Sequence, residues 1–206
     1  MIKEKEGWQS KVKFYNNYVI KKLKSPREIE EGIKQYLKKK NKSHELKELV
    51  KKTIKLTNTS LKIIKKTKAP KDYFGNPEFI GPREIKQDRA ILMSDALENL
   101  ISKNKISEAQ KLIDQYIKLI LNLWQYKIHE LNYKFYSNYG VINNQVILLD
   151  FLEITEDKKE VIDYIKNKKW DSKKDLKKRI PPKLIEYYIK KMNENINLKN
   201  LEKFWK

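Results

Sequence analysis

The chain has 206 residues, 39% of them hydrophobic, a net charge of +20 and no cysteine. This length can bury a core without covalent cross-links, and the missing cysteine excludes disulfides, thiolate nucleophiles and cysteine metal sites. The N-terminal residues lack an apolar signal core, so we expect a soluble, cytoplasmic protein with no membrane partner.

The positive charge is unevenly distributed. Residues 1–72 carry 22 basic and 8 acidic residues, residues 73–155 carry 9 and 10, and residues 156–206 carry 16 and 9. Dispersed lysines usually form a solvated surface, but a charge of this size also attracts polyanions. A lysine-rich surface that binds RNA or an acidic protein is therefore the second interpretation, with residues 166–179 as its best candidate segment.

The first 40 residues predict a hairpin followed by a helix. Two apolar-alternating stretches flank Asn16-Asn17, a turn pair, within residues 7–24. Ser25-Pro26-Arg27-Glu28 has the spacing of a capping box with proline at the first helical position, and the helix should end near Lys40. A second helix is expected at about residues 44–56, and a strand near residues 60–64.

The middle of the chain predicts a break and then a buried helix. Residues 67–87 contain Pro70, Pro77 and Pro82, which predicts an irregular boundary segment or a loop over a cleft. Residues 89–97 then resemble a strand leading into a connector. After Ser107 the apolar residues cover nearly every face of a helix, as expected for a central, buried one.

Residues 138–153 form the most informative stretch. Asn138 ends a loop, residues 146–149 read as a short buried strand after the turn at Asn143-Asn144, and Asp150 follows that strand, where a carboxylate can face a ligand. Beyond Thr155, helices are expected at about residues 156–168, 183–193 and 196–205.

This order of elements resembles the protein-kinase-like superfamily, which includes aminoglycoside-phosphotransferase-like proteins. The resemblance rests on Tyr18-Val-Ile-Lys21, on the spacing of Asn138 from Asp150, and on Asp150-Phe151. It implies an α+β, two-lobed fold with a small β-rich N-terminal lobe that carries a helix. Residues 1–95 would form the nucleotide-binding lobe and hinge, and residues 96–206 a mostly helical lobe with the metal loop.

The resemblance also implies roles for residues in the N-terminal lobe. Lys21 would bind nucleotide phosphates, because an ammonium on a long stem can meet several oxygens. Glu30, with Glu31 as the alternative, would pair with this lysine. Ser10 and Val12 would belong to a simplified phosphate-covering stretch, and the backbone of Met93 and Ser94 would form the hinge that meets adenine.

In the C-terminal lobe, the resemblance makes Asn138 and Asp150 the magnesium ligands, through hard oxygens. Kinases place a catalytic aspartate where this chain has Tyr133, so Glu130 becomes the candidate general base. Leu152 stands where glycine usually follows Asp-Phe, which favours a constitutive geometry over a switching loop.

The sequence therefore predicts an ATP- and magnesium-binding, kinase-like phosphotransferase with an unknown acceptor, or a related protein that has lost transfer. The alternative is a non-enzymatic, mostly helical, basic nucleic-acid-binding protein.

Overall fold

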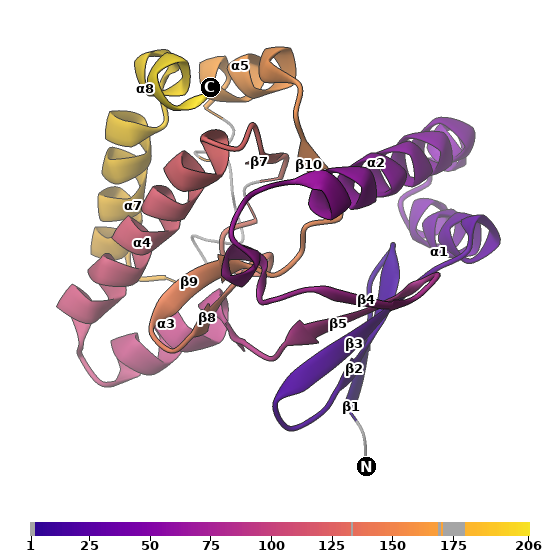
Figure 1. Cartoon of the computed structure of the whole chain (residues 1–206), viewed down its shortest axis with the longest axis horizontal. Helices are drawn as coiled ribbons and strands as arrows, with labels where there is room; N and C mark the ends of the chain where they lie inside the picture. The colour runs from indigo at the N-terminus through magenta and orange to yellow at the C-terminus, as the bar shows by residue number, and fades with distance from the viewer. Residues whose placement is uncertain (1–2, 133, 169, 171–179) are drawn as a thin grey trace.

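The computed structural model describes residues 3–132, 134–168, 170 and 180–206. It combines α-helices with a five-stranded antiparallel sheet of order β1-β2-β3-β5-β4 (Figure 1). The strands are β1 Lys3–Glu6, β2 Ser10–Phe14, β3 Tyr18–Leu23, β4 Glu78–Gly81 and β5 Glu84–Asp88. The sheet with α1 and α2 forms one side of the molecule, and most of the remaining helices gather on the other.

The predicted hairpin is present and extends further toward the N-terminus than expected. Asn16-Asn17 connects β2 to β3, and β1 adds a strand in front of them. The register sets Lys5, Val12, Lys21 and Ile85 side by side across four strands. Because cross-strand partners project from the same face, these four residues form one row on the face that carries Lys21.

The prolines of residues 67–87 do not make this segment irregular. After the short helical turn η2 (Lys71–Phe74), β4 and β5 form a hairpin that joins the sheet through β3. Ile85 and Gln87 are buried on one face, and Pro77 and Pro82 lie outside the two strands, where proline removes no ladder hydrogen bond. The prediction that this segment is irregular was therefore wrong.

Two helices follow β3 and pack on each other. α1 (Pro26–Lys39) begins with the predicted capping box, and its Ile29, Ile33 and Leu37 pack on the partly buried apolar side chains of α2 (Leu46–Lys66). The strand predicted at residues 60–64 is instead the last part of α2. Its buried residues recur every three or four positions (Thr53, Thr57, Ser60, Ile63 and Ile64), which is a helical period.

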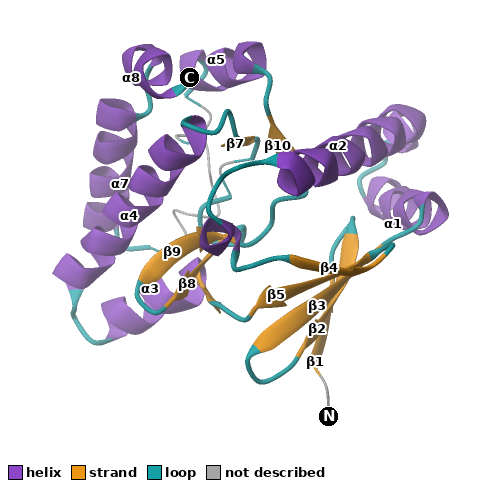
Figure 2. Ribbon diagram, in the orientation of Figure 1, coloured by secondary structure: helices purple, strands orange, loops and turns teal. Residues whose placement is uncertain are grey.

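The C-terminal half is mainly helical (Figure 2). Its helices are α3 Met93–Ser102, α4 Ile106–Trp124, α5 Lys158–Lys166, α7 Pro182–Asn195 and α8 Leu198–Phe204. α4 is buried on several faces and packs on α3, α7 and α8, which confirms the predicted central helix. Among the described helices, none is long and apolar enough to cross a membrane.

Short strands lie between the helices of this half. β6 (Ile91–Leu92) pairs with β8 (Tyr139–Ile142), which forms a hairpin with β9 (Gln145–Leu148). β7 (His129–Glu130) pairs with β10 (Ile154–Thr155). The largest apolar core includes Leu23, Ile63 and Ile85 together with residues of α4 and α7, so one core joins both parts of the chain.

Candidate functional site

Lys21 is buried and points from β3 toward the segment that follows β9. Its Nζ donates a hydrogen bond to the carbonyl oxygen of Leu149 at 2.6 Å and lies 5.2 Å from the centre of the Phe151 ring. Burial lowers the pKa of Lys21, and the nearby charge of Asp150 opposes this shift. The structure therefore brings Lys21 and Asp150, 129 positions apart in the sequence, into one electrostatic environment.

Asn138 and Asp150 are held next to each other by the backbone. The carbonyl oxygen of Asn138 accepts hydrogen bonds from the N–H groups of Leu149 and Asp150, at 2.8 and 3.0 Å. The Asp150 carboxylate accepts from the N–H of Leu152 at 3.4 Å and lines a cleft. The Lys21 ammonium and the backbone carbonyl of Asn138 therefore both bind the backbone of residues 149 and 150.

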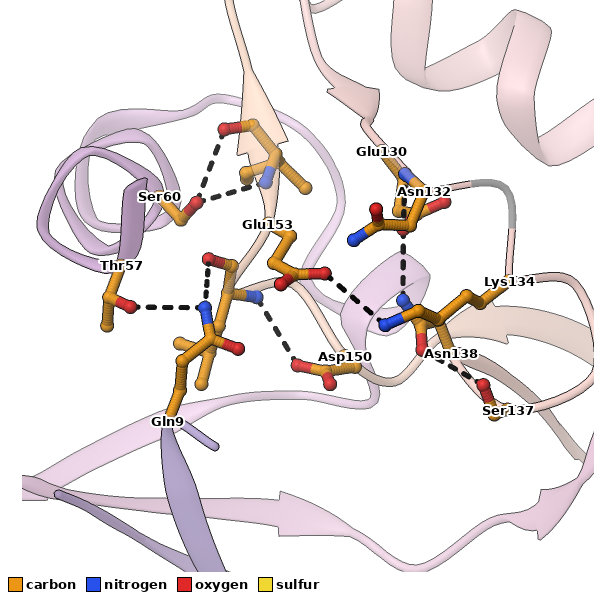
Figure 3. Close-up of polar contacts among 12 residues, drawn as sticks. Gln9, Thr57, Ser60, Glu130, Asn132, Lys134, Ser137, Asn138, Asp150 and Glu153 are labelled. Carbon is orange, nitrogen blue, oxygen red and sulfur yellow. Dashed lines mark hydrogen bonds and ion pairs between the residues drawn. The ribbon is translucent and has the colours of Figure 1, made fainter. Parts of the chain in front are cut away.

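The Asn138 side chain is oriented by Glu130 (Figure 3). Its Nδ2 donates to Glu130 Oε1 at 2.9 Å, and the N–H of Asn132 donates to the same oxygen at 3.0 Å. Asn138 Oδ1 accepts a hydrogen bond from the Ser137 hydroxyl at 3.2 Å. Since Nδ2 is committed to Glu130, Oδ1 is the atom that remains suited to a cation.

Glu130 does not occupy the place expected of a general base. Only 2% of its surface is exposed, and its carboxylate is engaged with Asn138 and Asn132. Its charge also contributes, after burial, to raising the pKa of Tyr164 to about 12. The predicted base is thus an orienting residue for the Asn138 amide, because the short strand β7 turns it into the core.

Helix α2 holds the backbone that follows Asp150. The Ser60 hydroxyl donates to the Ile154 carbonyl oxygen at 3.2 Å and accepts from the Ile154 N–H at 3.0 Å (Figure 3). Phe151 is fully buried, with its ring edge-on to Phe74 at a centroid distance of 6.1 Å. These contacts hold the backbone of residues 150–154 against α2 and Phe74, and the constitutive geometry expected from Leu152 stays a prediction.

A cleft of about 690 Å³ opens beside Asp150. The turn at residues 7–9, helices α2 and α5, and residues near Glu130 and Asp150 form its walls. Glu153 lines it as well, and burial raises the pKa of this carboxyl although Lys134, 3.8 Å away, opposes the shift. The cleft thus offers carboxylates and ammonium groups within the same walls.

A second hollow of about 740 Å³ lies at the connector between β5 and α3. It is lined by residues 89–92, by Phe14 of β2 and by Val141 of β8, with Lys3 and Lys5 of β1 on its rim. Lys5 shares the cross-strand row of Lys21. Sequence reasoning missed both β1 lysines, although the alternation Lys3-Glu4-Lys5-Glu6 places both of them on one face of a strand.

Two of the predicted nucleotide contacts are corrected. Glu30 is exposed on α1 and lines a shallow groove with residues of α2, while Glu31 is exposed and pairs with Arg27 at 3.1 Å. Within the described residues, no carboxylate of α1 or α2 reaches Lys21. The helix directly after β3 is packed on α2, and α2 takes the place beside the Asp150 segment.

Met93 and Ser94, the residues predicted to form a hinge, belong to helix α3. Met93 is fully buried at the start of α3, and the Ser94 N–H donates to the Tyr136 carbonyl oxygen at 3.1 Å. The connector between the sheet and α3 is formed by residues 89–92 instead. By contrast, the register puts Val12 opposite Lys21 and Ser10 opposite Leu23, on the same face of the sheet.

The donors fit magnesium bound together with phosphate. No group of three or more His, Cys, Asp or Glu side chains that could hold a metal occurs among the described residues. Mg²⁺ is commonly held by one or two carboxylates plus substrate phosphates, and it keeps several waters. In such a mode Asp150 would supply one carboxylate and Asn138 one amide oxygen, and the phosphates and waters would supply the remaining ligands.

Two features of the sequence fall outside the described residues. They are Tyr133, at the position of the kinase catalytic aspartate, and most of the lysine-rich segment at residues 166–179. A scan against protein-family models and searches of curated proteins and of solved structures found no match to this chain.

Proposed function

We propose that this protein binds ATP with magnesium between its sheet and its helical half, in a two-lobed arrangement like that of protein kinases. The observation that carries the proposal is that the Lys21 ammonium, the Asn138 backbone carbonyl and the charge of Asp150 lie around the backbone of residues 149 and 150. A buried ammonium, an amide oxygen and a carboxylate are the groups that phosphates and Mg²⁺ require. They come from three separate segments of the chain, which random placement of lysines does not explain.

Each residue has a definite task in the proposed site. Lys21 binds phosphate oxygens and neutralises their charge, while Asn138 and Asp150 hold the metal. Glu130 keeps the Asn138 oxygen directed at that metal through the bond to Nδ2. The bound Mg²⁺ supplies charge neutralisation at the phosphates, and the protein contributes positioning and electrostatics.

Phosphoryl transfer also needs a carboxylate for the acceptor hydroxyl. Glu153 lines the cleft beside Asp150, with 20% of its side chain exposed. The raised pKa of its carboxyl makes it a better proton acceptor than an ordinary surface glutamate. Glu153 therefore takes the role of general base that was expected of Glu130, and the acceptor enters through the 690 Å³ cleft.

Thermal-shift titration with ATP, in the presence and absence of Mg²⁺, tests the proposal. A ligand at about 100 times its Kd stabilises the folded state by about 2.7 kcal/mol, so a specific shift is measurable. We expect the wild type to show a magnesium-dependent shift and Asp150→Ala to lose it. Asp72→Ala, which removes an exposed carboxylate on η2, is the matched control and should behave as wild type.

An unchanged magnesium-dependent shift in Asp150→Ala would remove the proposal.

The alternative, a polyanion-binding surface, is favoured by one specific feature of α2. Lys47, Lys51, Lys55 and Lys62 are exposed along one side of this helix, and none of them forms an ion pair within the described part of the chain. Nucleic acid could follow such a row through its phosphates.

A further inference from the structure

Gln9 is a buried polar residue in the turn between β1 and β2. The turn is closed by a hydrogen bond from the Gly7 N–H to the Ser10 carbonyl oxygen at 2.9 Å, and the Lys24 N–H donates to the Gln9 carbonyl oxygen at 2.9 Å. Only 7% of Gln9 is exposed. A buried side chain in a short turn between strands has to find its hydrogen-bond partners elsewhere in the fold.

The Gln9 amide group bridges two other segments. Its Nε2 donates to Thr57 Oγ1 of α2 at 3.1 Å and to the Leu152 carbonyl oxygen at 3.2 Å (Figure 3). Thr57 donates its own hydroxyl hydrogen to the Thr53 carbonyl oxygen at 2.8 Å, so its oxygen acts as the acceptor for Gln9. Both hydrogens of the Gln9 amide therefore have acceptors.

The second of these bonds leads directly to Asp150. The Leu152 N–H donates to the Asp150 carboxylate, and the Leu152 carbonyl accepts from Gln9, so this one residue connects the turn to the proposed metal ligand. On its other side the turn is anchored by Trp8, whose ring lies edge-on to Tyr36 of α1 at 5.1 Å. The turn, α2 and the Asp150 segment form one hydrogen-bonded unit.

We propose that Gln9 is a positioning residue that couples the β1–β2 turn to Asp150. We expected Glu30 or Glu31 of α1 to pair with Lys21 and so to connect this helix to the site. Both glutamates are exposed, and neither forms an ion pair with Lys21. Gln9 with Thr57 supplies that link between turn, helix and metal segment. The coupling is a property of the ligand-free chain, while its effect on nucleotide rests on the proposed function.

Hydrogen exchange of the ligand-free protein tests the coupling. Gln9→Met keeps the shape of the side chain and removes the amide, and Thr57→Val removes the acceptor with little change in volume. Losing a buried hydrogen bond is worth about 1–2 kcal/mol, so we expect the amides of Leu152 and Ile154 to exchange about 5 to 30 times faster in each variant. Gln35→Ala, at an exposed position on α1, is the control and should leave these rates unchanged.

The double variant decides whether the two residues act together. If they share one link, Gln9→Met combined with Thr57→Val should accelerate exchange no more than the stronger single variant does. Unchanged exchange at Leu152 and Ile154 in Gln9→Met, or effects that multiply in the double variant, would overturn the coupling. If Gln9→Met does not fold, the exchange rates of Leu152 and Ile154 in Thr57→Val alone test the coupling.

Nucleotide binding gives an independent readout. Because the turn would cover phosphates, Gln9→Met should weaken ATP with Mg²⁺ by about 5- to 30-fold and leave adenosine affinity unchanged. Equal losses for ATP and adenosine would contradict a positioning role. Absence of magnesium-dependent ATP binding by the wild type would instead refute the proposed function, and the exchange rates would still decide the coupling.

Discussion

At the scale of single residues, the buried ammonium of Lys21 is an energetically costly feature of the structure. Only 7% of this residue is exposed, and its contacts are a carbonyl oxygen, a ring face and a nearby carboxylate. Desolvation of a charge is offset only in part by such neighbours. The site therefore holds an ammonium that a phosphate would stabilise further.

Lys21→Met should separate stability from binding. Replacing a buried charge by an apolar side chain of similar volume is often neutral or stabilising, by up to about 4 kcal/mol, so we expect a higher urea midpoint for the ligand-free variant at pH 7. Its affinity for ATP with Mg²⁺ should fall at least about tenfold, as measured by calorimetry. If Lys21→Met were less stable than wild type and bound ATP with Mg²⁺ equally well, Lys21 would not be a buried phosphate ligand.

The pH dependence has a definite sign. Burial lowers the pKa of Lys21, so the unfolded chain binds this proton more tightly than the folded one. The resulting cost to stability is fully present below the folded pKa and disappears as the pH rises toward the unfolded value. The free energy of unfolding of the wild type, measured with urea, should therefore rise as the pH becomes alkaline. Lys21→Met should not show this rise.

His129 provides a second residue-scale prediction. Burial lowers its pKa to about 3, and its Nδ1 accepts a hydrogen bond from Trp124 Nε1 at 3.0 Å. Because the unfolded imidazole binds its proton near pH 6.5, stability should fall as the pH drops below that value, by about 2 kcal/mol at pH 5. His129→Gln keeps an acceptor for Trp124, so urea unfolding should show this loss only in the wild type.

His44 is the matched control for that measurement. It is 78% exposed, so His44→Gln should keep the wild-type dependence of stability on pH. An equal loss between pH 7 and pH 5 in wild type and His129→Gln would show that the buried imidazole is not the group responsible.

Which site residues could be predicted depends on how local their signals are. Asn138 and Asp150 flank one hairpin, and Lys21 lies on a strand whose alternation is visible in the sequence, so each could be named. The roles of Glu30 and Glu130 depended on which side of an element meets the core, which tertiary packing decides. Gln9 gave no signal, because a buried glutamine in a turn looks like any polar loop residue.

At the scale of elements, the hairpin β8–β9 is crowded against the connector to α3. A Cβ atom at Gly140 would lie 2.8 Å from the Ile91 carbonyl oxygen and 2.9 Å from Ala90 Cβ. Backbone atoms of the paired strand β6 cannot move away without breaking that pairing. The close pairing of β8 with β6 thus leaves no room for a side chain at residue 140.

Gly140→Ala should therefore destabilise the protein by about 1–3 kcal/mol, measured by urea unfolding. Gly81→Ala is a matched control, since a Cβ there would meet Glu84 at ordinary distances of 3.7 and 3.8 Å. Equal stability of Gly140→Ala and wild type would show that β6 and β8 are less closely packed than described.

Errors in predicting the elements had physical causes. Thr57, Ser60 and Ile63 are weak helix formers that suit strands, yet packing of α2 on β10 keeps them helical. The prolines of residues 67–87 predict irregular structure, but Pro77 and Pro82 lie outside β4 and β5, where they remove no hydrogen bond between the strands. Long periodic helices and the Asn-Asn turn were predictable because their signals are local.

At the scale of the whole molecule, the net charge is +20, whereas the cleft beside Asp150 is lined by both lysines and carboxylates. Binding of a small ligand inside the cleft depends on a few groups, whereas binding of a polyanion would use many surface lysines and release many counterions. We therefore expect ATP affinity to change by less than about tenfold between 50 and 200 mM salt.

Single-stranded RNA bound across the lysines of α2 should lose affinity much more steeply over the same range of salt. Lys51→Glu combined with Lys55→Glu, two exposed positions on α2, should abolish any such binding and leave ATP binding intact. RNA binding with a steep salt dependence, without magnesium-dependent ATP binding, would favour the alternative function.

We propose that Lys21, Asn138 and Asp150 form one nucleotide and metal site. A crystal structure with ATP and Mn²⁺, which accepts the same oxygen ligands as Mg²⁺ and gives an anomalous signal, tests it most directly. We predict an anomalous peak bounded by Asn138 Oδ1 and the Asp150 carboxylate, with Lys21 Nζ on a phosphate oxygen. A nucleotide bound elsewhere, or a metal that contacts neither residue, would contradict the claim.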